Sequence, residues 1–153
     1  MASSVAVVTG ASQGIGQFTA IRLARDFSAI MLVARNRANL ERTAAAVKEA
    51  GARALVLDVD LALPSAAQRV VDEAVATFGG IDALLNIAGA VPQIDLFEMT
   101  DEQWEAGLAL KLHGARRLTM AAWPALAKSK GAVVFMSGNT ASRGRSRSSW
   151  PSW

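Results

Sequence analysis

The chain has 153 residues, of which 52 % are hydrophobic and 19 % are charged, which is typical of a globular domain. It contains no cysteine and a single histidine, so disulfides and thiolate metal sites are excluded and a histidine metal site is not expected. The formal net charge of +3 comes from Arg143, Arg145 and Arg147. The rest of the chain is neutral, and nucleic acid is therefore not an expected partner. No apolar stretch is long enough for a membrane span or a secretory signal, so no membrane contact and a cytoplasmic location are expected.

Short apolar runs alternate with helical patterns along the chain. Strands are predicted over residues 5–8, 30–33, 54–57, 83–85 and 132–136. Helices are predicted over residues 14–26, 36–50 and about 64–80, and from residue 100 toward residue 127. Strands that are apolar on both faces and separated by helices indicate a parallel sheet covered on both sides. The predicted fold class is therefore α/β, a Rossmann-type doubly wound parallel sheet of about five strands.

Individual residues refine the predicted helices. The first helix is expected to pack through an apolar stripe of Ile15, Phe18, Ile21 and Leu23. Thr100 and Gln103 have the spacing of a capping box. Pro124 is expected to kink the last helix or to end its regular part.

The sequence changes character after Ser137. Residues 142–153 contain no aliphatic side chain and no periodicity, and are expected to form a disordered basic tail after a domain of residues 1–141. An Arg/Ser-rich segment could contact RNA, but a solvated terminus is the simpler interpretation.

A glycine-rich turn follows the first predicted strand. Gly10 permits a tight turn, Gly14 lets the backbone approach a pyrophosphate, and Gly16 lets the following helix pack close to the sheet. The same turn contributes Ser12, Gln13 and Ile15 to a candidate cofactor site at the helix N-terminus. A purely structural turn is the alternative. The position between a strand and a helix favours dinucleotide binding.

The end of the second strand indicates which dinucleotide is bound. NAD sites place an acidic residue there to accept a hydrogen bond from a ribose hydroxyl. This chain has Arg35 and Asn36 instead, and an arginine suits a 2′-phosphate. NADP(H) is therefore the predicted cofactor and NAD(H) the less favoured one, unless Arg35 is only a solvated residue at a helix start.

Two further strand ends provide candidate cofactor-binding residues. Asp58 could accept a hydrogen bond from an adenine amino group while Val59 packs on the ring, although Asp58 could also be a simple turn residue. Ala88 and Gly89 are small enough for a ribose to lie close, and Asn86 could tie neighbouring strands through its amide.

Together these features resemble the short-chain dehydrogenase/reductase family over residues 5 to about 140. The resemblance rests on Thr9-Gly10-x3-Gly14-x-Gly16, Asp58-Val59, Asn86-x-Ala88-Gly89, Trp104 and Gly131-Ala-Val-Val134. It implies a seven-stranded Rossmann sheet and NAD(P)(H)-dependent interconversion of a small-molecule alcohol and a carbonyl compound. It also implies a homo-oligomer, which truncation would weaken.

The catalytic residues implied by the resemblance are not found. The position of the family's catalytic asparagine holds Lys111, and the position of its serine holds Gly138 with Ser137 one residue earlier. The chain contains no tyrosine, so the family's Tyr-x-x-x-Lys motif is missing from this sequence. Lys111 could act as a replacement proton relay, although a structural role is favoured, and His113 is expected to be structural or solvated. No catalytic residue is assigned.

We therefore expect an NADP(H)-dependent oxidoreductase of this type that is inactive in the present form, because the chain stops before a sixth and a seventh strand. The alternatives are a non-catalytic NADP(H)-binding module and an out-of-frame truncation product. No metal is expected.

Overall fold

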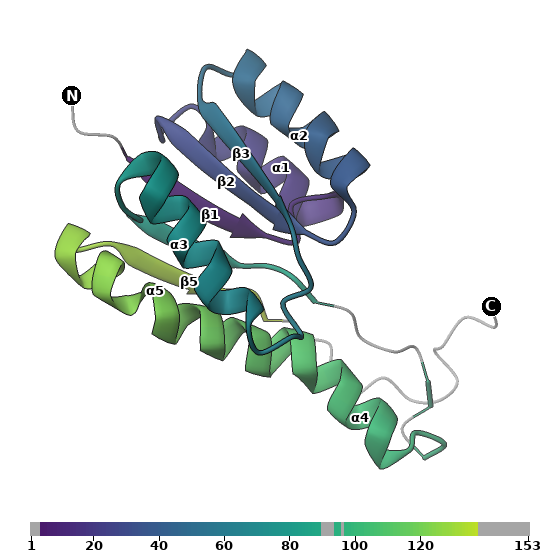
Figure 1. The fold of residues 1–153 in the computed structure, drawn as a ribbon. Coiled ribbons are helices and arrows are strands. Elements are labelled where there is room, and N and C mark those ends of the chain that lie inside the picture. Colours follow the sequence, from purple (N-terminus) through teal and green to yellow (C-terminus); the bar gives the residue numbers. More distant parts are fainter. Residues whose placement is uncertain (1–3, 90–93, 96, 138–153) are drawn as a thin grey trace.

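The computed structural model describes residues 4–89, 94–95 and 97–137 (Figure 1). Five strands form one sheet in the order β3-β2-β1-β4-β5, and every pairing between neighbours is parallel. The strands are β1 (Val5–Thr9), β2 (Ala29–Ala34), β3 (Arg53–Asp58), β4 (Ala83–Asn86) and β5 (Ala132–Phe135). The predicted tail of residues 142–153 and Gly138 lie outside the described residues.

The strands alternate with helices along the chain. The helical segments are α1 (Gly14–Leu23), α2 (Arg37–Glu49), α3 (Ala66–Phe78), α4 (Asp101–Leu108), the π-helical η1 (Ala109–Gly114) and α5 (Ala115–Ser129). Each predicted strand and helix is present, with ends shifted by a few residues. The predicted Rossmann-type doubly wound parallel sheet is thereby confirmed.

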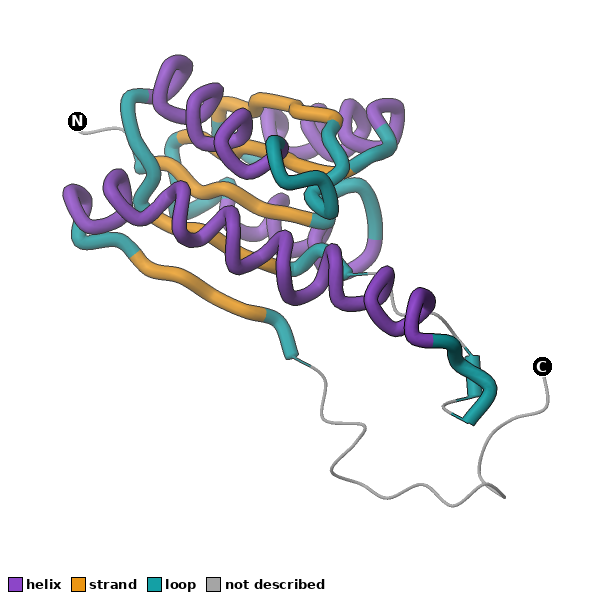
Figure 2. Tube along the Cα trace, turned by 60° about the horizontal axis from the view of Figure 1, so that its bottom comes forward, coloured by secondary structure: helices purple, strands orange, loops and turns teal. Residues whose placement is uncertain are grey.

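Helices cover both faces of the sheet, as Figures 1 and 2 show. Successive side chains of β1 point to opposite faces, because side chains alternate along a strand. Val7 packs in a core formed with α3 and α5, whereas Ala6 and Val8 pack in a second core with α1 and α2. The central strands β1 and β2 are thus apolar on both faces because each face is buried under its own pair of helices.

The predicted apolar stripe of α1 is wrong in part. Ile15 is 61 % exposed and Phe18 is 71 % exposed, while the buried residues of α1 are Gly16 and Ala20. Small residues face the sheet because α1 lies very close to the turn that precedes it. The larger side chains are therefore directed away from the core.

The last helical region continues through Pro124 and departs from α-helical geometry before it. The capping box of Thr100 and Gln103 is present, and α4 begins directly after it. Pro124 does not end α5, which continues to Ser129. The carbonyl that Pro124 leaves without its helical donor belongs to Met120, on an exposed side of α5 where water can bind it. The departure from α-helical geometry is η1, well before the proline.

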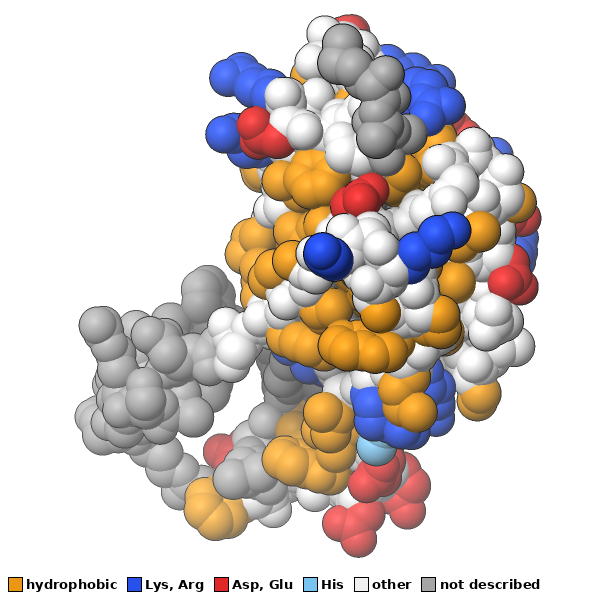
Figure 3. All heavy atoms as spheres, turned by 90° about the vertical axis from the view of Figure 1, so that its left-hand side faces the viewer, with side chains coloured by type: hydrophobic (Ala, Val, Ile, Leu, Met, Phe, Trp, Pro, Cys, Tyr) orange, Lys and Arg blue, Asp and Glu red, His pale blue; other side chains and the backbone are white. Residues whose placement is uncertain are grey.

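The outer end of this helical region is acidic. Figure 3 shows acidic side chains gathered at one end of the molecule, next to a histidine, and His113 Nε2 lies 4.0 Å from Glu105 Oε2. The structural or solvated role of His113 stays a prediction. No helix within the described ranges is long and apolar enough to cross a membrane.

Candidate functional site

A cleft of about 480 Å³ opens at the carboxyl edge of the sheet. β1 and β4 are neighbours there, and the chain leaves them toward opposite faces. In doubly wound folds ligands bind at such a switch point. A larger hollow of about 690 Å³ lies between α3 and α5 and includes Gly79 and Gly80, which precede β4. It lies at the opposite edge of the sheet, so the carboxyl-edge cleft is the candidate site.

Most of the sequence-predicted cofactor residues line this cleft. They are Gly10, Ser12, Gln13, Gly14, Ile15, Gly16, Arg35, Asn36, Val59, Ala88 and Gly89. Asp58 and Asn86 do not line it. The lining residues that sequence reasoning missed are Val33, Ala34, Asn39, Asp60, Leu61, Ile87, Leu110 and Met136. Several of them end a strand or directly follow one, which is the signal that could have identified them.

The glycine-rich turn has a geometry that side chains would disturb. Gly10 and Gly14 have φ values of +69° and +56°, in the left-handed region that favours glycine. A Cβ on Gly10 would lie 3.0 Å from Ala88 N, and a Cβ on Gly16 would lie 2.2 Å from Gly10 O. Gly16 thus permits a close approach, as predicted, but the nearest atoms belong to the turn and not to a strand.

Hydrogen bonds fix this turn to the neighbouring elements. Ala11 N donates to Val33 O over 3.3 Å, and Ala11 O accepts from Thr43 Oγ1 over 3.0 Å. Thr43 also accepts from Gln17 Nε2 at 3.2 Å. The turn is therefore held by β2, α1 and α2 before any ligand binds.

The N-terminus of α1 is suited to a phosphate group. The N-cap residue Gln13 makes no side-chain capping bond, and the first turn contains no acidic residue. The first N–H groups of a helix have no partner within the helix, and the helix dipole is positive at this end. No heavy atom lies within 4 Å of the position of a Cβ on Gly14. The residues present thus fit the pyrophosphate of a dinucleotide.

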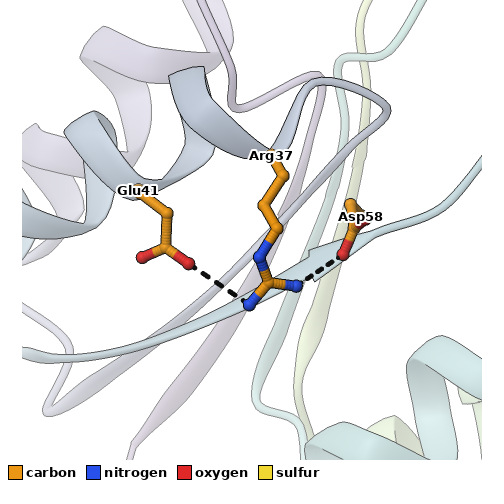
Figure 4. Close-up of polar contacts among 3 residues, drawn as sticks. All are labelled: Arg37, Glu41 and Asp58. Atoms are coloured by element: carbon orange, nitrogen blue, oxygen red, sulfur yellow. Dashed lines mark hydrogen bonds and ion pairs between the residues drawn. The ribbon is translucent and has the colours of Figure 1, made fainter.

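Two arginines follow β2 and have different surroundings. Arg37 Nη1 donates to Asp58 Oδ1 at 2.8 Å, and its Nη2 lies 3.3 Å from Glu41 Oε1 (Figure 4). Arg35 lines the cleft, is exposed, and makes no hydrogen bond or ion pair within the described part of the chain. Arg35 is therefore the arginine at this strand end whose charge is not neutralised by a carboxylate.

Asp58 interacts with the protein at the place where a contact to adenine was predicted. A backbone hydrogen bond, followed by the hydrogen bond from Arg37, lowers the pKa of the Asp58 carboxyl below its usual value. The carboxylate is thus engaged at the rim, outside the cleft wall. The acidic residue that does line the cleft is Asp60, whose Oδ1 accepts from Ala62 N at 3.0 Å.

The predicted tie between strands through Asn86 is wrong. Asn86 Nδ2 donates to Thr119 Oγ1 at 3.2 Å, so its side chain connects β4 to α5. The tie between β1 and β4 is made by Thr9, whose Oγ1 donates to Leu85 O and accepts from Ile87 N and Ala88 N. Thr9 thus holds the Ala88 segment against the glycine-rich turn.

The positions that correspond to catalytic residues lie on the β4–β5 side of the cleft. Lys111 is in η1, and a Cβ on Gly89 would lie 2.9 Å from its Cδ. Ser137 is exposed and directly follows Met136, which lines the cleft. No group of three or more metal-ligating side chains occurs among the residues that the structure describes.

A parallel sheet in the order β3-β2-β1-β4-β5, with a glycine-rich turn leading into α1, defines a Rossmann-type nucleotide-binding fold. The family model for short chain dehydrogenases matches residues 4–150, and the chain belongs to this family.

Named relatives agree with this assignment. The short-chain reductase protein NovJ of Streptomyces niveus is 41 % identical over 118 residues, which are 77 % of this chain and 45 % of that protein. The structure of L-sorbose reductase from Gluconobacter frateurii, complexed with NADPH and L-sorbose, superposes with a TM-score of 0.81 at 36 % identity. That match covers 87 % of this chain and 51 % of the reductase. NAD⁺-bound xylitol dehydrogenase gives a TM-score of 0.86 at 30 % identity, with 93 % and 55 % coverage. The chain spans about half the length of the curated relatives that it matches.

Proposed function

We propose that the carboxyl-edge cleft binds NADP(H) and that the chain is the cofactor-binding portion of an oxidoreductase acting on small-molecule alcohols and carbonyl compounds. The observation that carries this proposal is Arg35, an exposed arginine without an ion-pair partner in the described ranges, at the end of β2 where NAD-binding proteins need a carboxylate. The two solved relatives described above hold NADPH in one case and NAD⁺ in the other. The choice of NADP(H) therefore rests on this chain's own residues.

Each part of the cleft has a proposed partner on the cofactor. The N–H groups of Gly14, Ile15 and Gly16 face the pyrophosphate, assisted by the positive end of the α1 dipole. Arg35 and Asn36 bind the 2′-phosphate, and Val59 packs on the adenine. When bound, the nicotinamide supplies or accepts the hydride. Ala88 and Gly89 leave room for the adjoining ribose.

The proposal predicts that Arg35 sets the preference for NADPH over NADH. A hydrogen bond to a charged group contributes about 1.5–3 kcal/mol, which corresponds to roughly 10- to 150-fold in affinity. Arg35→Met should therefore reduce the ratio of NADPH to NADH affinity by at least about tenfold, and Arg35→Asp should reverse or erase the preference. Isothermal titration calorimetry at low salt measures both affinities.

The matched control is Arg25→Met, because Arg25 is an exposed arginine that follows α1 and does not line the cleft. The control should leave the ratio of the two affinities unchanged. If the wild-type protein binds NADH as tightly as NADPH, or if both arginine variants lower the ratio equally, the assignment to NADP(H) is wrong.

A second candidate function is NADP(H) binding without turnover, and the composition of the chain favours it. In related enzymes a tyrosine exchanges the substrate's hydroxyl proton, and this sequence contains no tyrosine. Loss of general acid–base assistance alone costs about 10²–10⁴-fold in rate. We therefore propose no turnover above background for this chain. A homo-oligomer, and a small-molecule alcohol or carbonyl compound as substrate if the chain is active, are also proposals.

Absorbance of the reduced cofactor tests the inactivity. Purified protein is mixed with NADP⁺ and a panel of secondary alcohols, and with NADPH and the matching ketones. Turnover that disappears in Lys111→Ala or Ser137→Ala would contradict the proposal of an inactive chain and would identify a rearranged active site. Absence of turnover, together with measurable NADPH binding, supports the binding-only function.

A further inference from the structure

The side chain of Lys111 lies beside Gly89, a residue of the cleft wall, although Lys111 itself does not line the cleft. Lys111 is in the π-helical segment η1 and directly follows Leu110, which lines the cleft. A Cβ on Gly89 would lie 2.9 Å from Lys111 Cδ and 3.5 Å from Lys111 Nζ. Gly89 lines the cleft, and its lack of a side chain leaves room for the amino group of Lys111 directly behind the wall.

The amino group of Lys111 is unpaired within the part of the chain that the structure describes. The side chain is half-buried, yet no hydrogen bond or ion pair joins it to any residue of the ranges 4–89, 94–95 and 97–137. The Lys111 ammonium has three donors and no acceptors among these described residues. A bound ligand with acceptor oxygens would provide them.

The order of the strands decides which half of a dinucleotide lies near Lys111. Arg35 and Val59 follow β2 and β3, on one side of the central turn, whereas Gly89 and Met136 follow β4 and β5 on the other. If the 2′-phosphate of the adenosine half is held by Arg35, the nicotinamide half lies across β4 and β5. This step rests on the function proposed above.

We infer that Lys111 binds the nicotinamide half of the cofactor and makes the cleft prefer the reduced form. Its ammonium donates to the hydroxyls of the nicotinamide ribose, which accept hydrogen bonds. The oxidised nicotinamide ring carries a positive charge and the reduced ring is neutral. A cation next to the ring therefore repels NADP⁺ and leaves NADPH unaffected.

The test compares three ligands, which are NADPH, NADP⁺ and 2′-phospho-ADP-ribose, a fragment without the nicotinamide ring and its ribose. Lys111→Met should weaken NADPH binding by about tenfold, the effect of one charged hydrogen bond. NADP⁺ should weaken by less than about threefold, because the loss of the hydrogen bond is offset by the loss of repulsion. The affinity for 2′-phospho-ADP-ribose should not change.

Two further variants separate charge from structure. Lys111→Arg keeps the positive charge and should keep a preference for NADPH over NADP⁺. Lys48→Met removes an exposed lysine in the last turn of α2, outside the cleft, and should change none of the three affinities. Circular dichroism of each variant confirms that it is folded as the wild type is.

The outcomes distinguish this inference from the proposed function. If the wild type binds NADPH and 2′-phospho-ADP-ribose, but Lys111→Met weakens NADPH and NADP⁺ equally or leaves both unchanged, the inference about Lys111 is wrong and the proposed function stands. Weaker binding of 2′-phospho-ADP-ribose by Lys111→Met also overturns the inference. If the wild type binds neither ligand, the proposed function fails and the inference fails with it.

Discussion

Replacement of Gly16 by alanine perturbs the cleft at its tightest backbone contact. Gly16 is in the first turn of α1, where alanine would ordinarily stabilise a helix by about 0.5–1 kcal/mol relative to glycine. The new Cβ would lie 2.2 Å from Gly10 O and 2.6 Å from Gly10 C. Both are backbone atoms, so no side-chain rotation relieves the overlap. The turn or the helix must move.

The size of this movement sets the expected effect. Real Cβ atoms essentially never approach other heavy atoms closer than 3.0 Å, so the contact must open by roughly 0.8 Å. Overpacking of this kind costs about 1–3 kcal/mol, which exceeds the gain in helix propensity. A net loss of about 1–2 kcal/mol lowers the melting temperature by about 2–8 °C for a chain of this size. A misplacement of about 1 Å in a site can cost about 10²-fold in rate, and we expect the shifted turn to lower NADPH affinity by about tenfold.

Thermal unfolding by circular dichroism and calorimetric titration with NADPH measure the two effects. The matched control is Gly80→Ala, because Gly80 has no heavy atom within 4 Å of its added Cβ and no positive φ. It should change stability by no more than about 0.5 kcal/mol. If Gly16→Ala unfolds at the wild-type temperature and binds NADPH within twofold of the wild type, the close approach of α1 to the turn does not position the cleft.

Two further predictions concern the rim of the cleft and the start of α4. Because the pKa of Asp58 is lowered in the folded protein, its ion pair with Arg37 stabilises the fold above the pKa of the unfolded state, and this contribution is lost as pH falls through the folded pKa. Arg37→Met should move the Asp58 pKa upward in an NMR titration, and an unchanged value would refute the pairing. Thr100→Ala removes the capping bond to Gln103 N and should destabilise α4 by about 1 kcal/mol. Amide hydrogen exchange in the variant should then be faster in α4 and unchanged in α2. Equal protection of α4 in the wild type and in Thr100→Ala would contradict this role.

The local features of this fold could be predicted from the sequence because each depends on residues close to it. The strand and helix order follows from apolar periodicity, and the end of α2 follows from Gly51, whose φ is +103°. The glycine-rich turn is identifiable because Gly10, Gly14 and Gly16 perform separate local tasks. The capping box can be predicted because Thr100 and Gln103 stand three positions apart in the sequence.

The remaining features depend on residues far apart in the sequence, and only the tertiary structure decides them. The buried side of α1 is its small-residue side because Gly16 contacts Gly10 O, which periodicity does not reveal. Asp58 is directed to Arg37, 21 residues earlier, and Asn86 to Thr119, 33 residues later. The side chain of Lys111 reaches Gly89, which follows β4 and lies 22 residues earlier in the chain. Contacts of this kind form only when the helices pack on the sheet, and sequence patterns carry no information on which side chains then meet.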